Sequence, residues 1–229
     1  MRYDRACSTC VDGGVRFDGS VMGTLLLGLI LGMRHATDPD HVLAISTMIS
    51  RNPRLGRALR TGVVWGVGHT LTVLVVGVLM VLYGVTVPPR AVAAMDLIVA
   101  IMLVCLGAVS LRARIASPND TPTIAEGIVI SPVRPFVVGI IHGLAGSAGL
   151  TLFALTTIPS RAGALAYLGL FGVGTVLGMI LVTAGIAFPL KYAGKVSIRL
   201  PGLVSRAAGL LSVIAGIAFA VLGLGLARP

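Results

Sequence analysis

Six long apolar stretches, almost free of charged residues, dominate this chain of 229 residues. A helix needs about 20 residues to cross the apolar part of a bilayer, and each stretch is long enough to do so. The stretches do not alternate apolar with polar residues, which argues against a membrane β-barrel. We therefore predict an all-α membrane protein with six transmembrane helices, over Val21–Ile49, Thr61–Val85, Ala91–Leu111, Pro135–Ile158, Gly163–Leu190 and Arg206–Ala227.

Composition and charge support a membrane protein and argue against a soluble domain or a nucleic-acid-binding protein. Hydrophobic residues make up 56% of the chain and charged residues only 11%, which is too few to cover a soluble domain. The net charge of +10 does not indicate a nucleic-acid partner, because the basic residues lie at the ends of the apolar stretches. They are most frequent after the first, third and fifth stretches. The positive-inside rule then predicts a multi-pass protein of the cell (inner) membrane, surrounded by lipid, with both termini outside.

A long polar loop divides the stretches into two sets of three, and the two sets resemble each other. The sequence WGVGHT at 65–70 matches FGVGTV at 171–176, and His35 and His142 stand at nearly the same offset. Three helices per repeat would invert the second copy relative to the first. We predict a polar tail over 1–20, one repeat over 21–111, a central cytoplasmic loop over 112–134 and a second repeat over 135–229. A translation start at Met22 would exclude the tail and its Cys7–Cys10 pair.

The sequence RHATDPDH, from Arg34 to His41, places ionisable residues inside the first apolar stretch. Ionisable groups at membrane depth are costly and usually mark a functional site. On a helix, Asp38 would lie beside both His35 and His41, and Arg34 would reach Asp38. Pro39 lacks an amide hydrogen and its ring clashes with the His35 carbonyl, so we expect a kink with free backbone groups. The pattern predicts a cation site at this kink.

The residue types favour a divalent first-row metal ion. Imidazole and carboxylate groups suit Ni(II) or Co(II), whereas a Cu(I) site would need thiolates, which the cluster lacks. Packing histidines and helix-capping aspartates are the alternative, which we consider weaker for so dense a cluster. The candidate ligands in the motif are His35, Asp38, Asp40 and His41, and His69 and His142 are candidates from other apolar stretches. The supporting residues are Arg34, Thr37, Pro39, Thr70 and Ser147, whereas Asp96 and Glu126 are expected at the membrane interface.

These motifs resemble those of the nickel/cobalt transporter family. RHATDPDH has the His-x4-Asp-His pattern of the family signature RHAxDxDH, and Gly68-His69-Thr70 resembles the second family motif. The run Val138–Ala148 is similar to the shorter UreH-like branch, the urease accessory proteins that are read as nickel permeases. Unlike longer members, the chain has no LGxDTATE-like stretch in its second half, where His142 and small residues stand instead.

The resemblance implies secondary transport of Ni(II) or Co(II) as a substrate, with no permanently bound cofactor, and a functional link to a nickel enzyme such as urease. It points to His35, Asp40 and His41, which would displace part of the ion's water shell, whereas Asp38, His69 and His142 would complete or gate the site. Efflux instead of uptake stays open, as do an intramembrane metal-dependent enzyme and an accessory that hands nickel to an enzyme assembly complex. No nucleotide-binding loop of the form GxxxxGK[ST] occurs, which disfavours ATP hydrolysis by this chain. Because metal binding needs neutral imidazole, uptake should weaken as the pH falls through the histidine range.

Overall fold

The computed structural model describes residues 19–49, 55–84, 87–112, 132–144, 158, 160–196 and 200–226. All regular structure in these ranges is helical, which confirms the all-α class. The helices are α1 (Gly19–His35), α2 (Pro39–Ile49), α3 (Leu55–Tyr83), α4 (Pro89–Arg112), α7 (Arg161–Val196) and α8 (Leu200–Leu226), together with a short helix over Val133–Leu144. Four of them, α3, α4, α7 and α8, are long and apolar enough to cross a membrane.

The prediction of one membrane helix over Val21–Ile49 is wrong, because the chain leaves the helix between His35 and Pro39. A residue that precedes proline avoids the helical conformation, and proline itself is well suited to the first position of a helix. The His35 carbonyl was predicted from the sequence to be free. Instead, it accepts a hydrogen bond from the amide of Asp38 at 3.1 Å. A new helix then starts, with Val42 donating its amide to the Asp38 carbonyl at 3.0 Å.

The other predicted helices differ from the observed ones mainly at their ends. Helix α3 begins at Leu55 instead of Thr61, and α8 begins at Leu200 instead of Arg206. Pro201 lies in the first turn of α8, where a missing amide hydrogen breaks no bond, so this proline does not stop the helix. Of the stretch predicted over Pro135–Ile158, the structure describes a helix only to Leu144. Residues 1–18 and 113–131, which hold the tail and most of the central loop, lie outside the described residues.

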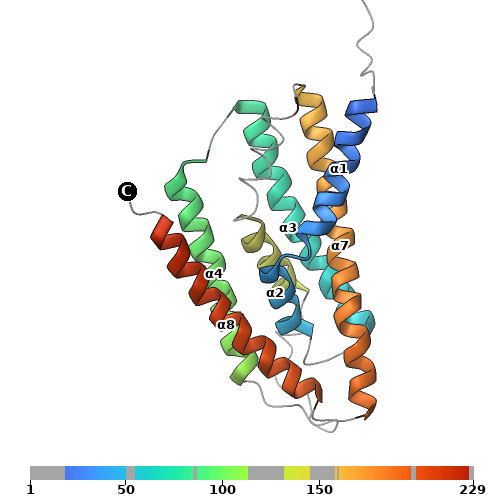
Figure 1. Ribbon diagram of the computed structural model, residues 1–229, viewed down its shortest axis with the longest axis vertical. Helices are drawn as coiled ribbons and strands as arrows, with labels where there is room; N and C mark the ends of the chain where they lie inside the picture. The colour runs from blue at the N-terminus through green and yellow to red at the C-terminus, as the bar shows by residue number, and fades with distance from the viewer. Residues whose placement is uncertain are drawn as a thin grey trace, which may run out of the picture.

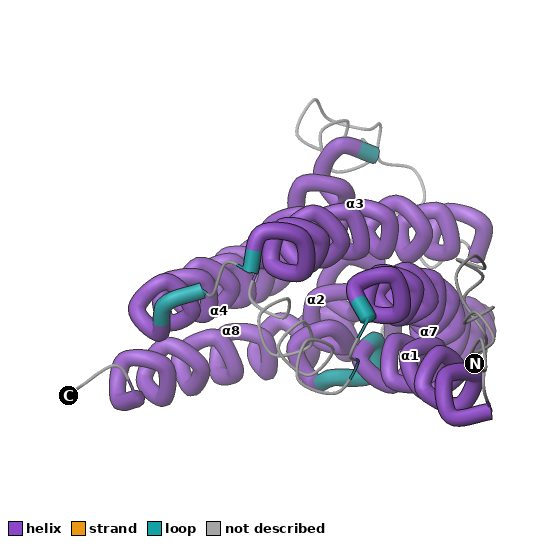
Figure 2. Tube along the Cα trace, turned by 90° about the horizontal axis from the view of Figure 1, so that it is seen from above, coloured by secondary structure: helices purple, strands orange, loops and turns teal. Residues whose placement is uncertain are grey.

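The described helices pack in three pairs around α2 (Figures 1 and 2). Helix α1 packs on α7, α4 packs on α8, and α3 contacts both α7 and the helix Val133–Leu144. Helix α2 lies between these pairs and contacts α3, α4, α7 and α8. Because α1 and α2 meet in the middle of this arrangement, their junction lies at the centre of the bundle.

Glycines let the paired helices touch backbone to backbone. A Cβ atom on Gly32 would collide with the Phe171 carbonyl of α7, and one on Gly139 would collide with the Trp65 carbonyl of α3. Between α4 and α8, a Cβ atom on Gly107 would lie 2.5 Å from the Gly209 carbonyl. Small residues permit this close approach between membrane helices, where van der Waals contact replaces the hydrophobic effect as the driving force. These contacts fix the helices that surround the α1–α2 junction.

Candidate metal centre

The junction between α1 and α2 brings two histidine rings close together. His35 is the last residue of α1, and His41 lies in the first turn of α2. Their ring centroids lie 4.5 Å apart, with the rings nearly perpendicular at 69°. The break in the helix thus turns two residues of one motif toward a common point.

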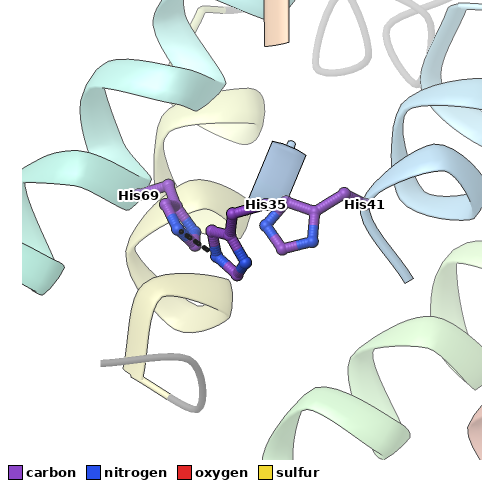
Figure 3. A group of neighbouring side chains, drawn as sticks. All are labelled: His35, His41 and His69. Carbon is purple, nitrogen blue, oxygen red and sulfur yellow. Dashed lines mark hydrogen bonds between the residues drawn. The ribbon is translucent and has the colours of Figure 1, made fainter. Parts of the chain in front are cut away.

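The two other histidines of the chain join them from α3 and from the helix Val133–Leu144. The centroid of His41 lies 5.0 Å from that of His69 and 4.3 Å from that of His142. The Nε2 atoms of His35 and His69 lie 3.3 Å apart, as the dashed line in Figure 3 marks. His41, His69 and His142 are at most 2% exposed, so the four imidazoles form a buried cluster. We call these four residues the histidine cluster.

Two aspartates bind the cluster from the junction. The carboxylate of Asp38 accepts a hydrogen bond from His35 Nδ1 at 2.7 Å. The carboxylate of Asp40 accepts from His41 Nδ1 with one oxygen and from His142 Nε2 with the other, each at 3.0 Å. Asp40 therefore joins α2 to the helix Val133–Leu144. Its side chain is 21% exposed, whereas that of Asp38 is 48% exposed.

These hydrogen bonds determine which imidazole nitrogens carry a proton. An ionised carboxylate only accepts, so His35 Nδ1, His41 Nδ1 and His142 Nε2 must donate to it. In a neutral imidazole the other nitrogen then presents a lone pair. Hydrogen bonds of this kind, donated by histidine to a carboxylate, fix the ring and raise the basicity of the free nitrogen in metal sites.

Several of the remaining nitrogens have no protein partner. His41 Nε2, His69 Nδ1 and His142 Nδ1 are buried and accept or donate no hydrogen bond within the described residues. A buried polar atom without a partner costs about 1–3 kcal/mol. Three such atoms lie in one cluster, so their free-energy costs add up there. A cation bound to these nitrogens would remove that cost.

The geometry gives two overlapping groups of possible metal ligands. His35, His41 and His69 form one group, and Asp40, His41 and His142 form the other. In each group the ligand atoms lie within 4.8 Å of one another. His41 belongs to both groups and therefore stands at their centre.

The supporting residues predicted from the sequence lie at the edge of the cluster or outside it. Arg34 is exposed and forms no ion pair with any described residue, so the predicted Arg34–Asp38 contact is wrong. The four-residue spacing requires a continuous helix, and α1 ends between these two residues. The predicted contact of Asp38 with His41 fails for the same reason, and Asp40 takes that role.

Threonine side chains near the motif bind backbone rather than imidazole. Thr37 donates to the Arg34 carbonyl at 2.6 Å, which closes the last turn of α1, and Thr70 donates to the Gly172 carbonyl of α7 at 3.4 Å. Pro39 is exposed at the first position of α2. Ser147 lies outside the described residues. Thr37, Thr70 and Pro39 thus have structural places, at the junction or between helices.

Two aromatic residues flank the cluster, and neither was among the site residues predicted from the sequence. The ring centroid of Trp65 lies 5.5 Å from that of His41 and 5.8 Å from that of His142. The ring of Phe171 lies 5.6 Å from that of His35. Both aromatic rings are at most 1% exposed, so they seal the cluster from two sides. The sequence did contain a feature that links these two residues, because they occupy equal positions in WGVGHT and FGVGTV.

Comparison with known proteins agrees with the motifs. A profile described as high-affinity nickel-transport protein matches residues 21–115. The urease accessory protein UreH of a Bacillus species is 33% identical over 208 residues, which cover 86% of this chain and 90% of that protein. The chain belongs to the nickel/cobalt transporter family, in its UreH-like branch. Together with its four membrane-length apolar helices, this membership makes the chain a multi-pass membrane protein.

Two further relatives match to different extents. A high-affinity nickel transport protein of Cupriavidus necator is 33% identical over 82 residues, 35% of this chain and 23% of that protein. The Arabidopsis thaliana chloroplast protein FOR GROWTH AND FERTILITY 1 is 27% identical over 218 residues, 87% of this chain and 57% of its own length. No solved structure matches the chain. The relatives that define the family are transport and accessory proteins, and the chain accordingly is not an enzyme.

Proposed function

We propose that this chain is a secondary permease that carries Ni(II), or Co(II), across the membrane through the histidine cluster. The observation that carries the proposal is the group of buried imidazole nitrogens without a partner among the described residues, on His41, His69 and His142. Buried polar groups nearly always have a hydrogen-bond partner, so several unpaired ones in one cluster suggest that a water or an ion binds there. The family membership indicates nickel as that ligand.

In this proposal the imidazoles bind the ion and the aspartates orient them. Asp38 holds His35, while Asp40 holds His41 and His142, so each ring presents its lone pair to the ion. The two carboxylates also offset the charge of a divalent ion. Asp40 can in addition offer an oxygen to the ion, as one of the two ligand groups indicates.

The donor set fits the proposed substrate. Imidazole binds nickel and cobalt well, whereas an oxygen-only site would favour magnesium or calcium. Two nitrogens that each lie about 2.1 Å from one ion are roughly 3 Å apart when the angle at the ion is between square and tetrahedral. The observed 3.3 Å between the Nε2 atoms of His35 and His69 agrees with that spacing.

We further propose that the six predicted helices form two inverted three-helix repeats. Contacts that exchange the two halves support this idea. Gly32 meets the Phe171 carbonyl as Gly139 meets the Trp65 carbonyl, and Gly174 meets Leu29 as Gly68 meets Phe136. Equal spacings in the sequence relate Leu29 to Phe136, Gly32 to Gly139 and His35 to His142. The same relation recurs between α4 and α8.

Helices α4 and α8 repeat one contact pattern at two places. A Cβ atom on Gly107 would meet Gly209 and Val213, and one on Gly216 would meet Ala100 and Val104. A two-fold axis that exchanges α4 and α8 converts one set of contacts into the other. Inverted repeats of this kind are common in secondary transporters, where they place the substrate site at the repeat interface.

The orientation in an inner membrane is also proposed from charge. Helices α3 and α8 begin, and α4 and α7 end, at the lower end of the bundle in Figure 1. Basic residues are more frequent at that end, namely Arg57, Arg60, Arg112, Lys191 and Arg206, whereas Arg90 and Arg161 lie at the other. The lower end would then face the cytoplasm, and both termini would face outward.

Nickel accumulation in cells tests the proposal. Radioactive Ni(II) and Co(II) should accumulate in cells that express the unaltered chain and not in cells that express His35→Ala or His41→Ala. The variant Ser212→Ala is a matched control, because it removes a buried hydrogen bond between α8 and the Leu103 carbonyl of α4, two helices that carry none of the four histidines. Equal accumulation in all cells, including those without the protein, would rule out uptake. Reduced accumulation with the unaltered chain alone would favour efflux.

A link to urease follows from the relative and has its own test. The Bacillus relative is a urease accessory protein, so we propose that this chain supplies nickel for such an enzyme. Deletion of the chain in its host should reduce urease activity at low external nickel, and excess nickel should restore it. A requirement that excess nickel does not relieve would instead favour a non-transporting accessory.

A further inference from the structure

Two groups of ligands share His41, and we infer that the transported ion occupies them in turn. We call His35, His41 and His69 the nitrogen position, and Asp40, His41 and His142 the mixed position. The inference rests on the proposed transport function and adds a path to it. His41 would keep its bond to the ion while the other ligands are exchanged.

The spacing of the rings favours two positions over one. His41 lies close to every other histidine of the cluster, whereas the centroids of His69 and His142 are 5.9 Å apart. No group of described residues whose ligand atoms lie within 4.8 Å contains both His69 and His142. A single ion that bound all four rings would require a larger rearrangement than an ion that moves past His41.

The two positions differ in chemistry in a way that suits transfer. The nitrogen position offers three imidazoles, whereas the mixed position replaces one of them by a carboxylate oxygen. A transported ion must bind strongly enough to enter and weakly enough to leave, and multiple adjacent positions satisfy both requirements. Because one ligand stays bound throughout, the ion never has to recover its full water shell between the positions.

The positions also differ in where their ligands come from. The nitrogen position uses α1, α2 and α3, and its His35 contacts the half-exposed Asp38. The mixed position adds His142 from the helix Val133–Leu144, beside the buried ring of Trp65. Passage from the first position to the second thus moves the ion from the side of Asp38 toward the second half of the chain.

Binding and flux, measured separately, test this path. We would measure Ni(II) binding to the purified protein by equilibrium dialysis and Ni(II) flux in liposomes that contain it. The variant His69→Gln should weaken binding by at least about tenfold, the lower end of the losses seen when metal sites are disturbed. The variant His142→Gln should bind Ni(II) nearly as tightly as the unaltered protein and yet lose most of its flux. Ser212→Ala should change neither quantity.

A spectroscopic readout separates a lost ligand from a general distortion. The visible absorption of bound Co(II) depends on its ligands, so it should change in His69→Gln and stay the same in His142→Gln at low Co(II) occupancy. His142→Asn, which also keeps an amide donor for Asp40, serves as a second variant if His142→Gln does not fold. Size-exclusion profiles identify folded variants.

The outcomes distinguish this inference from the function on which it rests. If the unaltered protein neither binds nor transports nickel, the proposed function fails. If it does both, but His69→Gln and His142→Gln lose binding and flux in the same proportion, a single position holds the ion and the two-position path is wrong. An equal spectral change in both variants would overturn it as well.

Discussion

Two helix pairs in this protein share their backbone contacts and differ in their polar side chains. In the pair α1–α7, Gly32 touches Phe171, and the Phe171 ring lies 5.6 Å from His35. In the pair of α3 and the helix Val133–Leu144, Gly139 touches Trp65, and the Trp65 ring lies 5.8 Å from His142. The scaffold around each of these histidines is therefore nearly the same.

The chemistry is not shared. Where α3 carries His69 after its Gly-Val-Gly run, α7 carries Thr175, whose hydroxyl donates to the Phe171 carbonyl of its own helix. The residues that follow His35 supply Asp38, Asp40 and His41, so the first half provides most of the polar groups. Backbone packing is thus nearly the same in the two pairs, whereas the groups proposed to bind the metal lie mostly in the first half of the chain.

The strongest test of this asymmetry is the loss of His41, the residue common to both ligand groups. We expect His41→Gln to reduce nickel accumulation to the level of cells without the protein, because neither group keeps three ligands. Thr175 of α7 stands where His69 stands in α3, and Thr175→Val should keep near-normal accumulation. Substantial transport by folded His41→Gln would show that the cluster is not the path of the ion.

The next effect distinguishes the two aspartates. Asp40→Asn should reduce Ni(II) affinity by about 10–100-fold, because Asp40 orients two imidazoles, one from each half. Asp38→Asn should cost less, because Asp38 orients only His35 and is 48% exposed. Equilibrium dialysis of the purified variants measures both. A greater loss for Asp38→Asn than for Asp40→Asn would contradict the assignment of Asp40 as the link between the halves.

The sequence predicted the helical class and brought together the residues of the motif, His69 and His142. Polar residues in an apolar chain are visible without a structure, since their cost in a membrane makes them rare. At Pro39 the sequence predicted only a kink, whereas the structure has a break between two helices. Sequence alone does not show whether the chain continues as the same helix or as a new one. The new helix is what places Asp40, and not Asp38, against His41.

Contacts between distant helices were the part that the sequence could not supply. Trp65 begins the repeated motif WGVGHT, but only its position next to His41 and His142 in the fold gives it a role beside the cluster. The exposure of Arg34 likewise depends on where α1 ends and which of its faces meets α7. Residue spacing predicts neighbours along one helix, whereas it does not determine which face another helix covers.

Glycine substitutions test whether the two pairs are equivalent as scaffolds. Gly32→Ala and Gly139→Ala should each destabilise the protein by about 1–3 kcal/mol, because each new Cβ would press on a backbone carbonyl that cannot move alone. Gly169→Ala in α7 is the control, since a Cβ there meets nothing within 4 Å. Thermal unfolding in detergent measures the change. A loss in only one of the two variants would break the equivalence of the pairs.

The smallest effect concerns the threonines that link α3 to its neighbours. Thr72 shares its hydroxyl proton between the Gly68 carbonyl of its own helix and the Ile140 carbonyl, each at 3.2 Å, and so ties α3 to the helix that carries His142. Thr70 reaches the Gly172 carbonyl of α7 only at 3.4 Å. Thr72→Val should cost about 0.5–1.5 kcal/mol, the usual net value of one hydrogen bond, and Thr70→Val should cost less. Thr175→Val should change stability least, since its hydroxyl bonds only within α7. Unfolding temperatures that fall in the order Thr72, Thr70, Thr175 would show that interhelical hydroxyl bonds support the His142 side of the cluster. A fall of equal size in all three would instead trace the loss to the threonine side chain itself, and not to the helix that it contacts.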